Sequence, residues 1–320
     1  MQNAASDARW LDAAARLAAR ARPLSRPNPA VGTIFVKDER VIARGWTQAS
    51  GRPHAEAHAL AQLPPGVAHG STAYVTLEPC AHESSRGPAC ADLLAEARPA
   101  RVVIGVVDPD PRTSGDGIAR LQAAGIEVEL LDTAASRTSL AGYLSQKRLG
   151  RPLVTLKIAI SQDGFMARPA GQDQWITGAE ARAHVHAHRA RQDAILVGSG
   201  TWRADRPRLD VRLPGIEDRS PKRYVLTTDG VPEGAEAIGS PGEIAALASL
   251  QYLYVEGGAA TAQAFLDADL VDRIHIYRAP ITIGEGLRAP EAFFDLLERW
   301  EVTEHRQLGS DTFTAYSRVS

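Results

Sequence analysis

The chain has few cysteines: only Cys80 and Cys90 occur among its 320 residues. Two cysteines exclude the disulfide framework that supports many small secreted domains. They leave three alternatives, namely a single bridge, two buried thiols or ligation of a metal. The chain also lacks an apolar run of the roughly 18 to 20 residues that cross a bilayer. Its first 24 residues are typical of an amphipathic helix rather than a secretory signal. We therefore expect a cytoplasmic protein with no membrane partner.

An excess of charge of one sign is also absent. The formal net charge is −2, from 17 Lys/Arg against 15 Asp/Glu in residues 1–150 and 19 against 23 in the remainder. Nucleic-acid binders carry a basic excess or stripe, because neutralisation of phosphates supplies much of their affinity. Neither half shows one, so we expect no nucleic-acid partner. The sequence leaves the oligomeric state open, a homo-oligomer included.

The length is about twice that of a usual domain, which predicts two domains. The first half alternates between short apolar runs and helical patterns. We expect strands at 30–38, 40–46, 72–77, 100–107 and 126–131, with Asp38 and Glu39 at the turn of a hairpin. Helices are expected in the first 24 residues, after His54, at 90–97 and at 117–125. This alternation predicts a three-layer α/β domain.

The alternation starts again after residues 143–154, where we place the domain boundary, giving domains 1–149 and 150–320. The second domain is expected to be α/β as well, with a first strand after Arg151 and further strands at 193–200, 223–228, 252–258 and 273–277. Helices are expected to begin near Ala179, Pro241 and Ala259. Residues 203–223 are rich in proline and charge, which predicts a long surface loop.

Four residues of the first half have the chemistry of a catalytic zinc site. His54, Cys80 and Cys90 offer one nitrogen and two sulfur ligands, the set that leaves a fourth tetrahedral position to water. Cys80 follows a buried strand, at a predicted helix start where unpaired N–H groups favour the thiolate. Glu56 lies two residues after His54, where it can face the water rather than the metal and act as a general acid and base. A capped helix with two buried thiols is the structural alternative.

The spacing of these residues is similar to the H-x-E and P-C-x-x-C signature of zinc nucleobase deaminases. His54-Ala55-Glu56 and Pro79-Cys80 match it, but the second cysteine follows ten residues after the first instead of three. A lone His-Ala-Glu tripeptide is a weak signal. Combined with a strand that ends in Glu-Pro-Cys and with the chain's only other cysteine nearby, it favours a deaminase site.

Longer motifs resemble the deaminase half of the bifunctional riboflavin-biosynthesis deaminase/reductase family. They are RPNPAVG, GRPHAEAHAL, AYVTLEPCAH, RGPAC and DPDP with a following GDG. The resemblance implies a cytidine-deaminase-like domain with zinc on His54, Cys80 and Cys90 and with Glu56 as the proton shuttle. It also implies substrate contacts at Asn28, His82 and Arg86. The segment between the cysteines is one residue longer than the family pattern, and Thr47 stands where a histidine is common.

In the second half, VEGGAATAQAFL at 255–266 reads as a strand, a glycine pair and a helix, an arrangement that can bind phosphate at the helix start. Alone, it is more often a structural turn. With LKIAISQDG, QWITG and DAILVGSGTWRADRPRLDVR, however, it resembles the reductase domain of the same family, which is similar to dihydrofolate reductase and uses NADPH. The implied cofactor contacts are Ala159, Trp175, Thr201, Asp205, Thr228, Gly258, Ala259, Ala260, Thr261, Ala262, Gln263 and Ala264. The implied substrate contacts are Asp173, where the family often has serine, and Arg189, Leu209, Arg212 and Glu256, with Lys157 and Asp163 in the motif that shapes the cleft.

The resemblance implies two consecutive reactions on one small phosphorylated pyrimidine. The first is the zinc-dependent hydrolytic deamination of 2,5-diamino-6-ribosylamino-4(3H)-pyrimidinone 5′-phosphate. The second is the NADPH-dependent reduction of the ribosyl side chain to ribityl. Two other readings stay open at this point: a single-activity zinc deaminase of tRNA or cytosine with a degenerate nucleotide-binding second domain, and a zinc-stabilised binding protein without catalysis.

Overall fold

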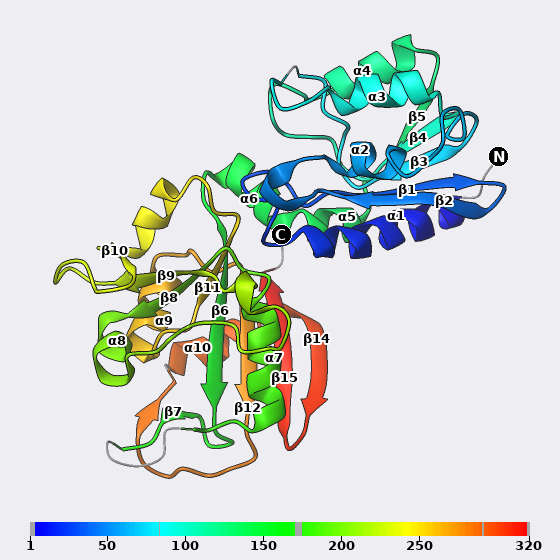
Figure 1. Cartoon of the computed structure of the whole chain (residues 1–320). Helices are drawn as coiled ribbons and strands as arrows, with labels where there is room; N and C mark the ends of the chain where they lie inside the picture. The colour runs from blue at the N-terminus through cyan, green and yellow to red at the C-terminus, as the bar shows by residue number, and fades with distance from the viewer. Residues whose placement is uncertain (1–3, 83, 170–174, 290, 319–320) are drawn as a thin grey trace. The chain divides into compact units, whose positions relative to one another are not determined.

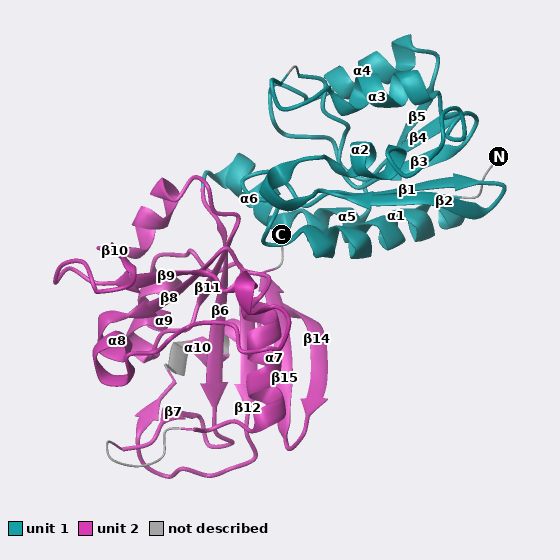
Figure 2. Ribbon diagram, in the orientation of Figure 1, with its two compact units in different colours: residues 1–150 teal, residues 151–320 magenta. Residues whose placement is uncertain are grey.

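The computed structural model describes residues 4–82, 84–169, 175–289 and 291–318, and it divides into two compact units. Unit 1 comprises residues 1–150 and unit 2 comprises residues 151–320 (Figure 2). The division falls one residue after the boundary expected from the sequence. None of the described helices combines the length and the apolar character that crossing a bilayer requires.

Unit 1 is a five-stranded sheet in the order β2-β1-β3-β4-β5 with helices on both faces (Figure 1). The first two strands form an antiparallel hairpin, and β3, β4 and β5 run parallel to one another. The strands are β1 (Gly32–Lys37), β2 (Arg40–Trp46), β3 (Thr72–Val75), β4 (Arg101–Ile104) and β5 (Glu127–Leu130). The α-helices are α1 (Ala4–Ala18), α2 (Ala55–Leu60), α3 (Cys90–Ala97), α4 (Asp116–Ala123), α5 (Ala134–Ser139) and α6 (Ala141–Leu149), with 3-10 turns η1 (Ala19–Ala21) and η2 (Ala49–Gly51).

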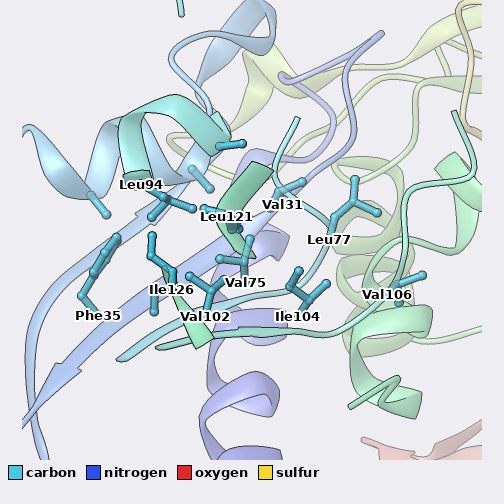
Figure 3. Close-up of a cluster of buried hydrophobic side chains, with 14 of the residues drawn as sticks. Val31, Phe35, Val75, Leu77, Leu94, Val102, Ile104, Val106, Leu121 and Ile126 are labelled. Carbon is cyan, nitrogen blue, oxygen red and sulfur yellow. The ribbon is translucent and has the colours of Figure 1, made fainter. Parts of the chain in front are cut away.

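Two apolar layers hold unit 1 together, one on each face of the sheet. On one face α1 packs Leu11 and Ala14 against Ile34 and Tyr74. On the other face α2, α3 and α4 cover the larger cluster, in which Figure 3 shows the buried side chains Val75, Leu77, Leu94, Val102, Ile104 and Leu121. Because both faces are covered, the central strand β3 is buried along its whole length, as the apolar sequence predicted.

Unit 2 is built on an eight-stranded sheet in the order β10-β9-β8-β11-β6-β12-β15-β14. Its first six strands are parallel and its last two antiparallel. Its strands are β6 (Leu153–Ile160), β8 (Ala194–Gly198), β9 (Lys222–Leu226), β10 (Glu236–Ile238), β11 (Tyr252–Val255), β12 (Arg273–Arg278), β14 (Trp300–Leu308) and β15 (Asp311–Arg318). A separate pair is formed by β7 (Phe165–Ala167) and β13 (Leu287–Arg288). The helices are α7 (Ala179–Arg189), α8 (Ser199–Asp205), α9 (Ala259–Asp267) and α10 (Glu291–Leu297), with 3-10 turns η3 (Glu217–Arg219) and η4 (Pro241–Ala246).

Helices again cover both faces of the sheet in unit 2 (Figure 1). On one face α7 packs Ala181 and Val185 against Tyr254, Tyr277 and Phe313. On the other face, Phe265 of α9 and Phe293 of α10 pack against the interior of the parallel strands. The prediction of two three-layer α/β domains is confirmed.

The expected elements differ from the observed ones mainly at their ends. The expected strand at 100–107 spans Arg101–Ile104, and the expected helix near Pro241 is a 3-10 turn. The expected loop at 203–223 begins inside α8, which ends at Asp205 and has Gly198 as its N-cap residue. The sequence reading assigned no element to residues 300–318, which form the β14–β15 hairpin. Its exposed strand β14 carries mostly charged and polar residues, so it gives no apolar signal.

Candidate functional site

The three predicted zinc ligands come together at one end of the parallel strands of unit 1. His54 is the N-cap residue of α2, Cys80 follows β3, and Cys90 opens α3. The donor atoms of all three residues lie within 4.8 Å of one another. The His54 Nδ1 atom is 3.3 Å from the Cys90 sulfur and 3.5 Å from the Cys80 sulfur. Both cysteines are buried and free, which rules out the single bridge.

These distances fit a tetrahedral zinc ion. With zinc–sulfur and zinc–nitrogen bonds of about 2.3 and 2.05 Å, the edge between a nitrogen and a sulfur ligand is about 3.6 Å. A hydrogen bond from the Cys90 thiol lowers the pKa of Cys80 to about 4, and the same contact raises the pKa of Cys90. A divalent ion binds cysteine as the thiolate, so it would displace the protons of this pair. The residues present fit the metal that the motif implies.

Glu56 lies in the first turn of α2 and is 3% exposed. Its carboxylate lies beside the Cys90 sulfur, so it faces the sulfur side of the cluster. Burial raises the pKa of Glu56, while the neighbouring His54 opposes the shift. A raised pKa favours the protonated form of the carboxyl group, which suits a general acid and base.

The remaining predicted residues of unit 1 surround this cluster. The Asn28 side-chain amide lies 3.1 Å from His54 Nε2 and donates to the carbonyl of Gly51. It therefore orients the imidazole, whatever further contact it makes with a substrate. The ring of His82 bonds the hydroxyl of Thr113. Arg86 is exposed and donates to the carbonyl of Ser50.

A buried carboxylate that the sequence reading did not single out fixes the strand end beside Cys80. Glu78 is 2% exposed and accepts hydrogen bonds at 3.0 to 3.2 Å from four backbone N–H groups, those of Asp108, Gly115, Gly117 and Ile118. A Cβ atom at Gly117 would lie 2.0 Å from the carbonyl oxygen of Pro79. The loop after β4, which carries Thr113, is thereby held against the residues that lead into Cys80.

In unit 2, eight predicted residues line one cavity of about 320 Å³ at the carboxyl ends of the parallel strands. Ligands in open α/β sheets commonly bind at this edge. The eight are Ala159, Trp175, Thr201, Asp205, Arg189, Arg212, Glu256 and Gly258. Lys157, from the motif expected to shape the cleft, also lines it. Asp163 instead accepts hydrogen bonds from Ser161 and from the N–H groups of Ile283 and Gly284, which fixes the adjoining loop.

Arg189 and Glu256 form a bidentate ion pair, with nitrogen–oxygen distances of 2.7 and 2.8 Å and side chains only 11% and 6% exposed. The third guanidinium nitrogen donates to the carbonyl of Asp210. Burial raises the pKa of Glu256, but Arg189 outweighs it and keeps the pKa below its ordinary value. The Lys157 ammonium lies 3.9 Å from the same carboxylate, and burial lowers its pKa. Arg189 thus holds Glu256, which in turn faces Lys157.

The start of α9 opens into the same cavity through Gly257 and Gly258. The N–H of Ala262 donates to the carbonyl of Gly258, so the amides before it point out of the amino end of the helix. A Cβ atom at Gly257 would lie 2.3 Å from the Cβ of Thr261. This close packing and the free amides fit a dinucleotide phosphate.

Other predicted contacts of unit 2 lie outside the cavity lining. Leu209 packs in a buried apolar cluster with Ile195, Val197 and Val225. Thr228 is exposed after β9, Ala262 is buried in the core, and Gln263 bonds Asp267 along the helix. The lining does not include Ala259, Ala260, Thr261 or Ala264 either. Asp173 lies outside the described residues. The roles of these positions stay predictions.

Arg182 and His186 were not among the predicted residues, yet they line the cavity from α7 together with Arg189. Their spacing from Arg189, seven and three residues, is that of one helix face and could have revealed them. The guanidinium of Arg182 lies over the Trp175 ring, 4.8 Å from its centre. With Lys157 and Arg212 they give the cavity more cationic than acidic groups.

Family models of known proteins match both units. The model of the cytidine and deoxycytidylate deaminase zinc-binding region matches residues 4–106, and that of the RibD C-terminal domain matches residues 152–240 and 242–314. The riboflavin biosynthesis protein RibD of Haemophilus influenzae is 34% identical over 99% of both chains, and that of Escherichia coli is 35% identical over 88% of this chain and 90% of the other.

Solved structures of similar proteins cover both units together. Acinetobacter baumannii RibD superimposes with a TM-score of 0.85, at 32% identity over 99% of this chain and 100% of the other. A diaminohydroxyphosphoribosylaminopyrimidine deaminase/5-amino-6-(5-phosphoribosylamino)uracil reductase from Thermotoga maritima superimposes with a TM-score of 0.88, at 29% identity over 99% of both chains.

Proposed function

The chain belongs to the RibD family of bifunctional riboflavin-biosynthesis enzymes, and from this premise we propose how its residues divide the two reactions. It is a zinc-dependent pyrimidine deaminase and an NADPH-dependent reductase. We assign the deamination to unit 1 and the reduction to unit 2. The convergence of His54, Cys80 and Cys90 beside the buried Glu56 is the observation that carries the assignment.

His54, Cys80 and Cys90 would hold the zinc ion. When bound there, zinc acts as a Lewis acid and lowers the pKa of water toward neutrality. Asn28 fixes the imidazole ring of His54, and Glu78 fixes the strand end at Cys80, so the donor atoms are held in place before a metal arrives. Because the donor atoms are held in place in advance, the site supports a permanently bound zinc ion rather than a transiently bound one.

Glu56 carries the proton of the first reaction. As water adds to the amine-bearing C2 of 2,5-diamino-6-ribosylamino-4(3H)-pyrimidinone 5′-phosphate, its carboxylate takes the proton that the water loses. It then passes this proton to the exocyclic amine, the carbon–nitrogen bond breaks, and ammonia leaves while C2 keeps the oxygen. The raised pKa of Glu56 suits both halves of this transfer. We expect His82 and Arg86, on the exposed loop between the cysteines, to contact the ribose phosphate.

Lys157 and Glu256 are the chemical groups of the second reaction. NADPH, when bound at the start of α9, supplies a hydride. The Lys157 ammonium supplies the proton that the ring oxygen takes up when C1′ is reduced and the C1′–O4′ bond breaks. Glu256, held by Arg189, orients the lysine and favours its charged form within a buried cavity. Arg182 and Arg212 supply positive charge for the substrate phosphate.

The single-activity deaminase is not supported as an alternative. A degenerate second domain would have no need of a buried Arg189–Glu256 pair, an aligned lysine and a close-packed glycine turn in one cavity. The family models also match both units.

The decisive experiment supplies the purified protein with the diaminopyrimidine phosphate, with and without NADPH. We expect ammonia release in both cases, but oxidation of NADPH, measured by its absorbance, only after deamination. Chelation of zinc should abolish ammonia release yet leave NADPH oxidation intact when the deaminated pyrimidine is supplied directly. Loss of both activities on chelation would contradict the division of labour.

Gly257→Ala should impair reduction alone. The new methyl group would lie 2.3 Å from the Cβ of Thr261, so the first turn of α9 must shift, at a cost of about 1–3 kcal/mol. We expect a higher KM for NADPH with ammonia release unchanged. Gly242→Ala is the control, because a Cβ atom there would have no neighbour within 4 Å. Equal KM values for the two variants would argue against a cofactor site at this turn.

A further inference from the structure

Unit 1 contains a second depression, of about 360 Å³, whose lining shares no residue with the metal cluster. It is lined by Leu17 at the end of α1, Arg20 of η1, Arg44 and Trp46 of β2, and His58 and Gln62 at α2. The lining includes two guanidinium groups and no acidic side chain. No step of the two reactions uses it.

The two arginines of this depression have no acidic partner. The Arg20 guanidinium lies over the Trp46 ring, 5.0 Å from its centre, and this contact fixes its position. Arg44 is exposed on β2. Within the part of the chain that the structure describes, neither guanidinium forms an ion pair. Since ten N–H donors lack a charged acceptor here, the depression favours an anion.

A third donor is fixed by the backbone. The His58 Nδ1 atom accepts a hydrogen bond from the backbone N–H of Trp46, and the Gln48 side-chain amide lies 2.8 Å from it. A backbone N–H can only donate, so Nδ1 is the unprotonated nitrogen and Nε2 carries the hydrogen. The ring also packs edge-on against Trp46. His58 therefore offers an N–H group whose direction is set before any ligand binds.

Two glutamines fix residues of the lining by hydrogen bonds. The Gln62 amide donates to the carbonyls of both Arg44 and His58, which ties β2 to α2. The Gln48 amide donates to the carbonyl of Trp46 beside its contact with His58. Donors held in this way lose little conformational freedom on binding.

We propose that this depression binds a phosphate monoester. Two unpaired guanidinium groups and an imidazole N–H match the charge and the acceptors of a phosphate dianion. The volume of about 360 Å³ lies at the small end of small-molecule pockets, and Leu17 and Trp46 offer apolar surface to an organic group. Its lining contains none of the residues assigned to the substrate phosphate in the proposed reactions, so it takes a second phosphorylated molecule.

The test is isothermal titration calorimetry of the zinc-loaded full chain with phenyl phosphate, and with inorganic phosphate in a second arm. The double variant Arg20→Gln/Arg44→Gln is compared with Arg16→Gln/Arg40→Gln, which removes the same charge from exposed positions of α1 and β2 outside the lining. Because the catalytic sites are unchanged in both, any difference reports on this depression. We expect phenyl phosphate binding to be at least about tenfold weaker in the first variant.

Two results would overturn the proposal. Superimposable phenyl phosphate isotherms for the two double variants would show that the depression binds no phosphate group. Inorganic phosphate that binds as tightly as phenyl phosphate, with the same loss in Arg20→Gln/Arg44→Gln, would show a site for the free ion and refute the ester. All four substituted arginines are exposed, so neither variant should disturb folding.

Discussion

Replacing Glu56 by glutamine lowers the rate of ammonia release by about 10²- to 10⁴-fold, the range that a positioned acid–base group contributes. Glutamine keeps the size of the side chain but cannot take a proton from water. Because Glu56 is not one of the three clustered donors, the variant should keep one zinc per chain. Reduction of the deaminated pyrimidine by NADPH should continue at the rate of the parent enzyme.

The control for this prediction is Glu96→Gln, which removes the same charge from an exposed position on α3. It should leave both rates unchanged. Zinc content is measured by elemental analysis, and ammonia by a coupled assay. A Glu56→Gln variant that deaminates normally with zinc bound would assign the proton transfer to another group, whereas one that loses zinc would make Glu56 a ligand.

Replacing Arg189 by methionine should destabilise unit 2 by about 3–5 kcal/mol and abolish reduction. The substitution leaves the carboxylate of Glu256 buried at 6% exposure without its bidentate partner, and an uncompensated buried charge is costly. Calorimetric unfolding of the full chain should show one transition moved to lower temperature. Ammonia release, assigned to unit 1, should persist below that temperature.

Two further variants separate stability from chemistry at this pair. Arg189→Met/Glu256→Leu removes both charges and should recover most of the lost stability while staying inactive in reduction. Arg203→Met breaks the exposed pair with Asp229, whose side chains are 64% and 67% exposed, and should cost less than about 1 kcal/mol. If Arg189→Met were as stable as Arg203→Met, the buried pair would not hold Glu256 in place.

The metal cluster could be predicted from sequence because its chemistry depends on rare residue types. The chain has two cysteines, and both lie beside an element end that the apolar pattern had located. The structural role of Glu78 was not predicted, because its hydrogen-bond donors are backbone amides 30 to 40 residues away in the sequence. Backbone donors have no sequence signature. Short sequence motifs therefore predict the metal ligands. They do not predict residues such as Glu78, which fix the backbone next to a ligand.

For the reductase cavity, the sequence predicted which residues contact ligands but not how these residues contact one another. Arg189 and Glu256 were both expected to contact substrate, yet they lie 67 residues apart in sequence and bond each other. Nothing in either segment indicates that pairing, since it depends on how α7 packs against β11, which ends one residue before Glu256. Likewise Leu209 stands in a motif rich in charge, but its side chain turns into an apolar cluster. The motifs predicted which segments surround the cavity. The packing of the folded chain determines which of their side chains face it.

The hydrogen bonds of Glu78 determine which loop of unit 1 can change its length when the enzyme's substrate range is redesigned. Four backbone amides between positions 108 and 118 donate to the carboxylate of Glu78, so the length of that segment is fixed. A single insertion or deletion there would displace Cys80 from the metal cluster. The stretch from Ser84 to Pro88 is held instead by arginine side chains, from Arg86 to the Ser50 carbonyl and from Arg52 to the Pro88 carbonyl. It lies in the segment between the cysteines, which is one residue longer than the family pattern. Libraries that vary loop length should therefore be built there.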